Sequence, residues 1–244
     1  MSILSTSSRA ATLRNALAAA WIVALYFICN PYRGVRHDAV LYFAQMQLHL
    51  TPAWMHGDLF FRFGSQDKYS IFSTLFAPVL QALGLSSAEI VILLALHALF
   101  LFATWRLTAG MPTTTRWCAM GLALVLPHFY SARHRFAFAE PFLTARSLAE
   151  PFAVLALAWL LRGRLALAMV AGAVAALSHP LIALPAWLVG WRLLCARDRR
   201  WNWAILLALP VAILAWLQVG PFGALAQSFD AQWFATGKMA NSFV

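Results

Sequence analysis

Charged residues are scarce in this sequence of 244 residues. They make up 11% of it, whereas about a quarter of the residues in a soluble globular domain are charged. Hydrophobic residues make up 62%, mean hydropathy is +0.72, and the apolar residues form continuous blocks rather than amphipathic spacing. These features exclude a soluble protein and predict an all-α, polytopic integral membrane protein.

Cysteine is rare, and clusters of metal-ligand type are missing from the sequence. The three cysteines, Cys29, Cys118 and Cys195, lie at the ends of apolar blocks without metal-like spacing, so the sequence indicates neither a disulfide framework nor a zinc site. The net charge of +10 does not indicate a nucleic-acid partner, because the arginines flank apolar blocks as the positive-inside rule predicts. The sequence requires no cofactor and leaves a divalent cation undecided.

The apolar blocks predict about seven transmembrane helices. We expect them at about 12–29, 87–108, 117–131, 148–161, 165–178, 181–194 and 203–219. Arg9 and Arg14 precede the first block, and no small-residue cleavage site follows it. This pattern is typical of an uncleaved signal anchor with a cytoplasmic N-terminus. We therefore expect a multi-pass protein of the bacterial inner (plasma) membrane.

The chain divides into a long membrane module and a short tail. Residues 1–219 form the transmembrane helical module, in which residues 30–70 are the first extracytoplasmic loop. The run 71–84 is too short for a standard span and predicts a re-entrant or interfacial helix. Residues 220–244 form an extracytoplasmic tail with no closing membrane segment, which indicates a fragment or one module of a longer protein.

The first outer loop contains a candidate amphipathic helix at 38–50. In a helix, Asp38, Tyr42, Gln45 and His49 would form one narrow polar stripe on a mostly apolar surface. Such a helix would lie in the membrane interface. Two interpretations stay open: Asp38 is an N-cap and the stripe faces water, or Asp38 is a general base held at the membrane surface.

Charged residues gather again on the predicted outer face later in the chain. Arg133 and Arg135 are followed by Glu140, Arg146 and Glu150, with aromatic residues between them. Arginines at an apolar interface suit a lipid phosphate, because a guanidinium group binds phosphate oxygens bidentately. The alternative is a set of Glu–Arg ion pairs that ties the loop to the helix end. Within the apolar run Glu150 needs a partner, and Arg146, one turn earlier, is the expected one.

Two histidines have a structural and a functional interpretation each. His179 precedes Pro180 in a predicted outer turn, where it either bonds a helix end or contributes to a site. His97 lies midway along 87–108, either as an interhelical hydrogen-bonding residue or as a proton relay.

The order of these features resembles the GT-C class of polytopic glycosyltransferases. The likeness rests on HDAVLY (37–42), YSIFSTLFAPVLQALG (69–84), LSSAE (85–89), ARSLAEPFAVLALAWLLRGR (145–164) and the Ser178-His179-Pro180 turn. It covers most of 12–219 as an architecture. The class usually carries an acidic pair in the first outer loop, and here Ala39 follows the single Asp38.

By this resemblance the protein would transfer a sugar from a polyprenyl-phosphate donor to a glycan or lipid acceptor on the extracytoplasmic face. Asp38 would be catalytic and would activate the acceptor hydroxyl. The donor phosphate would be held by Arg133, Arg135 and Arg146. The further substrate-binding residues would be Tyr42, Glu140, Glu150 and His179. Membrane lipids are the other expected partners.

Two alternatives from other classes stay open. One is a membrane transporter or flippase, which would use charged residues along a buried path. The other is a non-catalytic membrane subunit or a truncated pseudo-enzyme. The positions of Asp38 and Arg146 discriminate between an enzyme and a transporter. Proximity of the two residues at the outer interface favours an enzyme, whereas positions along a buried path favour a transporter.

Overall fold

The computed structural model describes residues 3–53, 55, 57–58, 60–61, 66–125, 129–130 and 136–219. It divides the chain into two compact units, Met1–Gly190 and Trp191–Val244. The described chain is all-α apart from one hairpin of two-residue strands, β1 (Phe129–Tyr130) and β2 (Phe136–Ala137), which pair antiparallel. The predicted all-α class is confirmed. The predicted tail, 220–244, lies outside the described residues.

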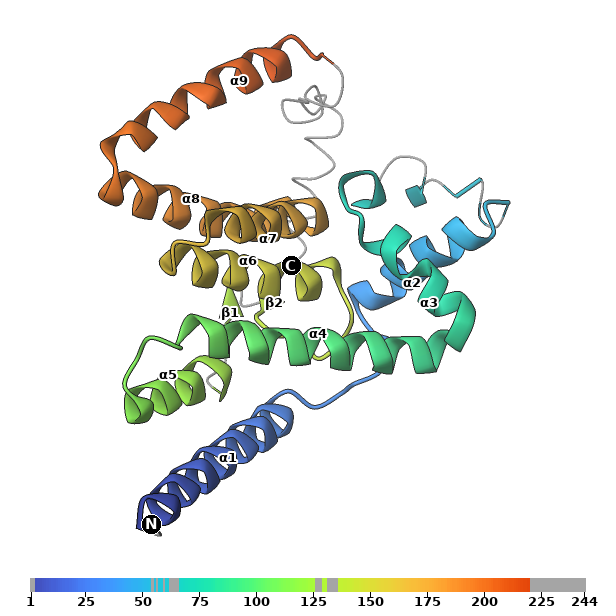
Figure 1. Cartoon of the computed structure of the whole chain (residues 1–244). Helices are drawn as coiled ribbons and strands as arrows, with labels where there is room; N and C mark the ends of the chain where they lie inside the picture. Colours follow the sequence, from blue (N-terminus) through green and yellow to red (C-terminus); the bar gives the residue numbers. More distant parts are fainter. Residues whose placement is uncertain are drawn as a thin grey trace. The chain divides into compact units, whose positions relative to one another are not determined.

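The helices follow the predicted blocks closely (Figure 1). The first unit contains α1 (Ile3–Cys29), α2 (Asp38–Leu50), a 3₁₀ turn (Gln66–Tyr69), α3 (Phe72–Leu83), α4 (Leu85–Leu107), α5 (Thr113–Val125), α6 (Ala145–Leu161) and α7 (Leu165–Ser178). Helix α8 (Pro180–Arg197) runs from the first unit into the second, where a 3₁₀ helix (Arg199–Leu207) and α9 (Ala208–Trp216) follow. The predicted helix at 38–50 and the predicted segment at 165–178 coincide with α2 and α7.

The number of membrane spans is where the structure differs from the prediction. Within the described ranges, two helices are long and apolar enough to cross a membrane: α1 over Arg9–Cys29, and α4. Helix α7 has 14 residues, and at 1.5 Å per residue it extends about 21 Å, less than the roughly 30 Å of a bilayer core. The block 203–219 is divided between a 3₁₀ helix and α9. The seven-span arrangement is therefore not confirmed.

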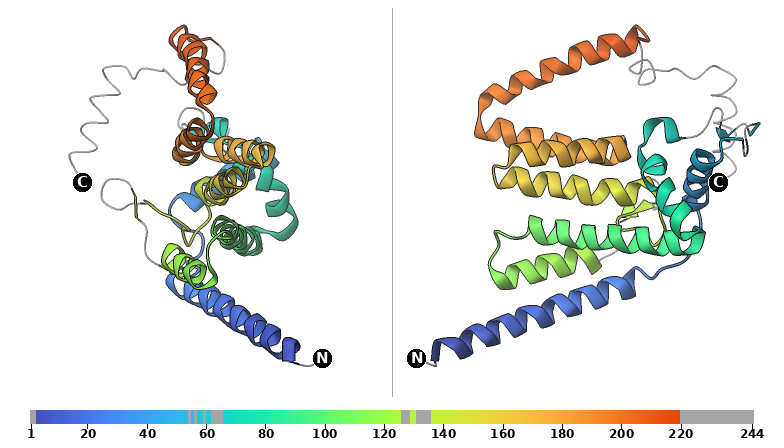
Figure 2. Two further views of the ribbon diagram at one scale, coloured as in Figure 1. Left: turned by 60° about the vertical axis from the view of Figure 1, so that its left-hand side comes forward. Right: turned by 45° about the vertical axis from the view of Figure 1, so that its right-hand side comes forward.

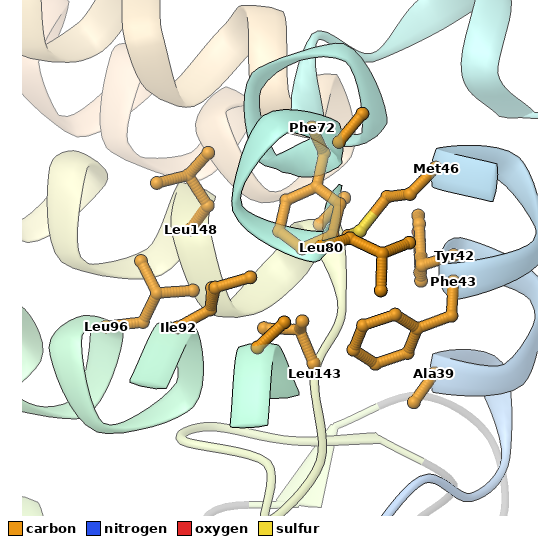
Figure 3. Close-up of a cluster of buried hydrophobic side chains, with 13 residues drawn as sticks. Ala39, Tyr42, Phe43, Met46, Phe72, Leu80, Ile92, Leu96, Leu143 and Leu148 are labelled. Carbon is orange, nitrogen blue, oxygen red and sulfur yellow. The ribbon is translucent and has the colours of Figure 1, made fainter. Parts of the chain in front are cut away.

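A hydrophobic core forms where α2, α3, the first half of α4 and the start of α6 meet (Figure 3). Phe43 and Met46 of α2 pack there with Phe72 of α3 and Leu143, which precedes α6. One apolar face of α2 thus packs on protein, while Val40 and Leu41 stay exposed. This packing fixes the first residues of α2 beside the first turn of α6, and all residues from 145 to 151 are buried.

Helices α4, α6 and α7 lie side by side beyond this core (Figure 2). Small residues at the contacts, Ala103, Ala171 and Ala175, allow close approach of the helices. The turn between α7 and α8 contains His179 in an extended conformation, with ψ 97°, because a residue before proline avoids the helical region. Trp187 of α8 then packs on Gly172 of α7 and donates its Nε1–H to the Gly172 carbonyl at 3.2 Å.

Large apolar side chains cover much of the surface of the first unit. Trp21 of α1 is 67% exposed, Leu94 of α4 is 50% exposed and Val170 of α7 is 62% exposed. Helix α1 packs on α5 through Ile22 and Leu124, with Trp117 donating to Asn15 Oδ1 at 3.3 Å, and large side chains elsewhere on α1, such as Trp21 and Ile28, are exposed. Exposed apolar side chains in such number are typical of a lipid-facing or protein-binding surface.

Candidate functional site

The site begins with the N-cap of α6. The Thr144 hydroxyl accepts the backbone N–H of Ser147 at 3.3 Å and donates its own hydrogen to Glu140 Oε2 at 2.9 Å. A threonine at this position satisfies one of the free N–H groups of the first helical turn. The cap therefore fixes two things at once: the start of α6, which places Arg146 at its second residue, and the side chain of Glu140.

Arg146 lies between two carboxylates that come from distant parts of the chain. Its Nε and Nη2 donate to both oxygens of Glu140 at 3.0–3.2 Å, and Nη2 also donates to Asp38 Oδ2 at 2.9 Å. Glu140 is 2% exposed and Arg146 is 6% exposed, whereas the side chain of Asp38 is 42% exposed. A buried pair thus holds a half-exposed carboxylate. We name Asp38, Glu140 and Arg146 the carboxylate–arginine triad.

Asp38 is the first residue of α2, and its carboxylate is directed at Arg146. The N-cap of α2 is His37, with φ 50° and no capping hydrogen bond from its side chain, and its ring packs on Phe142 at 5.4 Å between centroids. The interpretation of Asp38 as an N-cap is therefore wrong. Its position at the helix start is still favourable for a negative charge, because the helix dipole is positive there.

The middle of the polar stripe of α2 faces protein and not water. Tyr42 and Gln45 are buried: the Tyr42 ring packs edge-to-face on Phe72, and Gln45 Oε1 accepts the Ser73 hydroxyl at 3.2 Å. His49 Nε2 lies 2.6 Å from Asp67 Oδ2. The water-facing interpretation is wrong for the middle of the stripe because α3 covers it, an arrangement that helical periodicity alone does not reveal.

Tyr42 belongs to the triad's surroundings. Its pKa is raised, chiefly by burial; the positive charge of Arg146 and a hydrogen bond from the backbone of Ala145 oppose this, and the carboxylates of Asp38 and Glu140 add to it. The pKa of Glu140 is also raised by burial, against the opposing effects of Arg146 and Thr144. The site is therefore an electrostatically coupled group with one guanidinium and two carboxylates.

His179 lies within electrostatic reach of Arg146. Burial lowers the pKa of His179, and the positive charge of Arg146 lowers it further. The Nδ1 atom is buried and has no hydrogen-bond partner among the residues that the structure describes. The turn is held by α3's entry segment, where the Ser70 hydroxyl donates to the Ser178 carbonyl at 2.7 Å and Ile71 N–H donates to the Leu177 carbonyl at 2.9 Å.

Glu150 has a different contact from the one predicted. We expected an ion pair with Arg146 one turn earlier, and Arg146 forms salt bridges with Glu140 and Asp38. Oε2 of Glu150 accepts the backbone N–H of Ala139 at 2.9 Å, and Ala139 has φ 54°. The loop folds back over the helix start, so its backbone reaches Glu150. Glu150 thereby shapes the loop that carries Glu140.

Two of the predicted substrate-binding residues, Arg133 and Arg135, lie outside the described residues and stay predictions. Sequence reasoning missed Thr144, although a threonine before an apolar helical run is a recognisable N-cap signal.

His97 contributes to the position of Glu140. Its Nε2–H donates to the Glu140 carbonyl at 3.2 Å, and its ring packs against Tyr26 and Phe27 of α1. This contact is consistent with the structural interpretation of His97.

The triad's chemistry is that of a held, partly exposed carboxylate. Asp38 can accept a hydrogen bond or a proton from a ligand hydroxyl while Arg146 fixes its orientation. Among the described residues, no group of three or more His, Cys, Asp or Glu side chains is arranged to hold a metal ion. Comparisons with protein-family models, with curated proteins and with solved structures found no match.

Proposed function

We propose that the protein is a GT-C-like glycosyltransferase of the bacterial inner membrane. It transfers a sugar from a polyprenyl-phosphate donor to a glycan or lipid acceptor on the extracytoplasmic face. The observation that carries the proposal is the triad: the buried Arg146, paired with the buried Glu140, donates to the carboxylate of Asp38 at 2.9 Å, and the Asp38 side chain is 42% exposed. Proximity of Asp38 and Arg146 is the arrangement that favours an enzyme over a transport path.

Asp38 is the catalytic residue of the proposed reaction. The acceptor hydroxyl oxygen attacks the anomeric carbon of the sugar, and the bond from that carbon to the phosphate oxygen breaks. The hydroxyl proton passes to the Asp38 carboxylate, and polyprenyl phosphate leaves with the bonding electrons. A carboxylate held by hydrogen bonds in one orientation is well placed for this proton transfer.

The contacts of Arg146 refine its proposed role. Two carboxylates already share its guanidinium, and their charges together exceed its own by one. Arg146 therefore orients Asp38, and binding of the donor phosphate falls to Arg133 and Arg135, with the buried Nδ1 of His179 as a further hydrogen-bonding group.

The proposed membrane location rests on the surface and on two helices. Helices α1 and α4 meet the length and composition of a span, and large apolar side chains are exposed along α1, α4 and α7. The proposed topology has seven spans and a cytoplasmic N-terminus. The shorter helices would cross as members of a bundle, at the cost of some local thinning of the bilayer.

The test uses membranes that contain the whole chain and a labelled polyprenyl-phosphate sugar. The wild-type protein should transfer label to endogenous acceptors, and Asp38→Asn should lower the rate by at least about 100-fold, since a general base contributes roughly 10²–10⁴. Asp58→Asn is the matched control. It removes the same charge from the same loop, where Asp58 caps a turn by accepting the Phe60 N–H at 2.8 Å. Equal rates for the two variants would contradict the proposal.

A transporter is the second candidate, and one observation favours it. His97 is buried midway along α4, and its Nδ1 has no hydrogen-bond partner in the described part of the chain. The hydroxyl of Tyr26, whose ring lies 5.3 Å from the imidazole, is likewise buried and without a partner there. Uptake of a labelled lipid across proteoliposomes that is lost in His97→Phe and retained in Asp38→Asn would support transport over transfer.

A further inference from the structure

Four arginines from three separate segments converge at the end of α4 that lies away from the triad. We name Arg106, Arg116, Arg162 and Arg164 the arginine cluster. They come from the last turn of α4, the first turn of α5 and the turn after α6. The sequence explains each singly as a flank of an apolar block. It does not explain why they meet.

Trp105 lies at the centre of the cluster. The guanidinium of Arg116 stands over its ring at 4.7 Å from the centroid, and that of Arg106 at 5.7 Å. Nη2 of Arg116 also donates to the Trp105 carbonyl at 2.9 Å. Two guanidinium groups are therefore held against one indole, an arrangement that lowers their freedom and fixes the positions of their charges.

Backbone capping explains part of the cluster. Arg162 donates from Nη1 to the Ala158 carbonyl at 2.6 Å and from Nη2 to the Arg106 carbonyl, so it bonds the free carbonyl groups at two helix ends. Cations at a helix C-terminus are stabilised by the helix dipole, which carries only about half an elementary charge. Even the two helix ends together, with about one elementary charge, do not balance four guanidinium groups.

The described residues supply no carboxylate partner either. Within the part of the chain that the structure describes, none of the four arginines forms a salt bridge. The pKa of Arg162 is lowered by burial first, and then by the charges of Arg106, Arg116 and Arg164. The Nε–H of Arg116 is buried and has no acceptor among the described residues. Arginine stays protonated in proteins, so the cluster carries positive charge that no salt bridge of the described residues neutralises and that a bound anion would neutralise.

The location of the cluster indicates which anion. It lies at the end of α4, a candidate span, beside a tryptophan, a residue that prefers the level of the lipid headgroups. Arg146 and Arg162 stand at opposite ends of α6, about 24 Å apart at 1.5 Å per residue. We propose that the arginine cluster binds the phosphate-bearing headgroup of an anionic membrane lipid on the face opposite to the triad. This rests on the membrane location proposed above.

The binding chemistry follows from the donors. A phosphodiester offers two anionic oxygens, and guanidinium groups bind such oxygens bidentately. The buried Nε–H of Arg116 gains its acceptor, and the repulsion among the four charges falls. The free phosphate ion has the same oxygens, so the experiment must separate the lipid from the ion.

The experiment measures binding of phosphatidylglycerol to the full-length protein in mild detergent by native mass spectrometry. Phosphatidylcholine is the neutral lipid, and inorganic phosphate is the free ion. Wild-type protein should retain phosphatidylglycerol in preference to phosphatidylcholine. Arg116→Gln with Arg162→Gln should weaken phosphatidylglycerol binding by about 30-fold, because each arginine near an anionic surface contributes about fivefold.

The matched control is Arg199→Gln with Arg200→Gln, which removes the same charge from exposed positions in the second unit; it should leave binding within about twofold of the wild type. Arg164→Gln is a second test variant, for use if the protein with Arg116→Gln and Arg162→Gln does not fold. The exposed Arg164 side chain forms no hydrogen bond with the described residues, and this variant should bind about fivefold more weakly.

Three results would overturn the proposal: equal weakening in both double variants, unchanged binding in Arg164→Gln, or displacement of the lipid by millimolar inorganic phosphate. Asp38→Asn should bind phosphatidylglycerol as the wild type does. The assay records binding and not transfer, so its failure is separate from a failure of the proposed glycosyltransferase activity.

Discussion

Removing Glu140 should destabilise the protein far more than removing the charge of Asp38. Both carboxylates contact the same guanidinium, but Glu140 is 2% exposed and Asp38 has a side chain that is 42% exposed. Breaking a buried ion pair from one side costs about 3–5 kcal/mol, because the remaining charge stays buried without its partner. An ion pair with an exposed member contributes about 0–1 kcal/mol.

The expected shifts in thermal unfolding follow from these free energies. For a chain of this length, each kcal/mol corresponds to about 2–4 °C in Tm. Glu140→Gln should therefore lower Tm by roughly 6–20 °C, and Asp38→Asn by no more than about 4 °C. The assay is thermal unfolding in mild detergent, followed by tryptophan fluorescence at one detergent concentration and pH.

A double variant distinguishes the loss of one member of the Glu140–Arg146 ion pair from the loss of both members. Replacing Glu140 and Arg146 together by leucine removes both buried charges, and such replacements are often neutral or stabilising. Tm should then recover most of the loss seen in Glu140→Gln. If Glu140→Gln lowers Tm no more than Asp38→Asn does, or if the double variant is the least stable of all, the argument from burial is refuted.

Three further perturbations have outcomes that the structure fixes. Gly172→Ala places a Cβ 3.1 Å from the Trp187 ring and should destabilise the protein by about 1–3 kcal/mol in thermal unfolding. Gly121→Ala is the control: its Cβ meets nothing within 4 Å in a helix interior, so it should stabilise the protein by about 0.5–1 kcal/mol. Equal shifts in Tm for the two variants would contradict the packing of Trp187 on Gly172. Thr144→Val should destabilise by about 1–2 kcal/mol through loss of the N-cap and of the bond to the buried carboxylate, and Thr144→Ser should retain most of it in the same assay. His179 has a lowered pKa, so the unfolded chain binds its proton first and stability falls as pH drops below about 6.5; His179→Asn should flatten this part of the Tm–pH curve, and an unchanged curve would contradict it.

The helices were predictable because each carries its own signal. A continuous apolar block predicts a helix whatever it packs against, and α7 begins and ends at the predicted residues. The Ser178-His179-Pro180 turn was predictable from proline alone. The helix lengths were not, because a block of apolar residues does not show where a 3₁₀ segment interrupts it, as over Arg199–Leu207.

The site was predictable in composition and not in pairing. Asp38 and Arg146 were identified from charge beside apolar surface, but Glu140 as the main partner of Arg146 depends on the path of the loop between β2 and α6. A helical spacing of four residues made Glu150 the obvious partner, and the left-handed conformation of Ala139 gave Glu150 a backbone N–H to bind. Helical periodicity predicts which residues are neighbours within one helix. It does not predict the contacts that a loop makes when it folds back on the helix.

The two contacts of the triad, Glu140–Arg146 and Asp38–Arg146, differ in how far apart their residues are in the sequence. Glu140 and Arg146 are six residues apart, and Arg146 and Asp38 are 108 residues apart. Loop closure over six residues is fast and over a hundred is slow, so we expect the buried pair to form first and Asp38 to join it only when α2 has docked. During synthesis the segment that carries Asp38 is therefore made before Arg146, and the contact between them can form only later. The 2.9 Å contact between Asp38 and Arg146 is consequently present only in molecules in which α2 has docked beside α6.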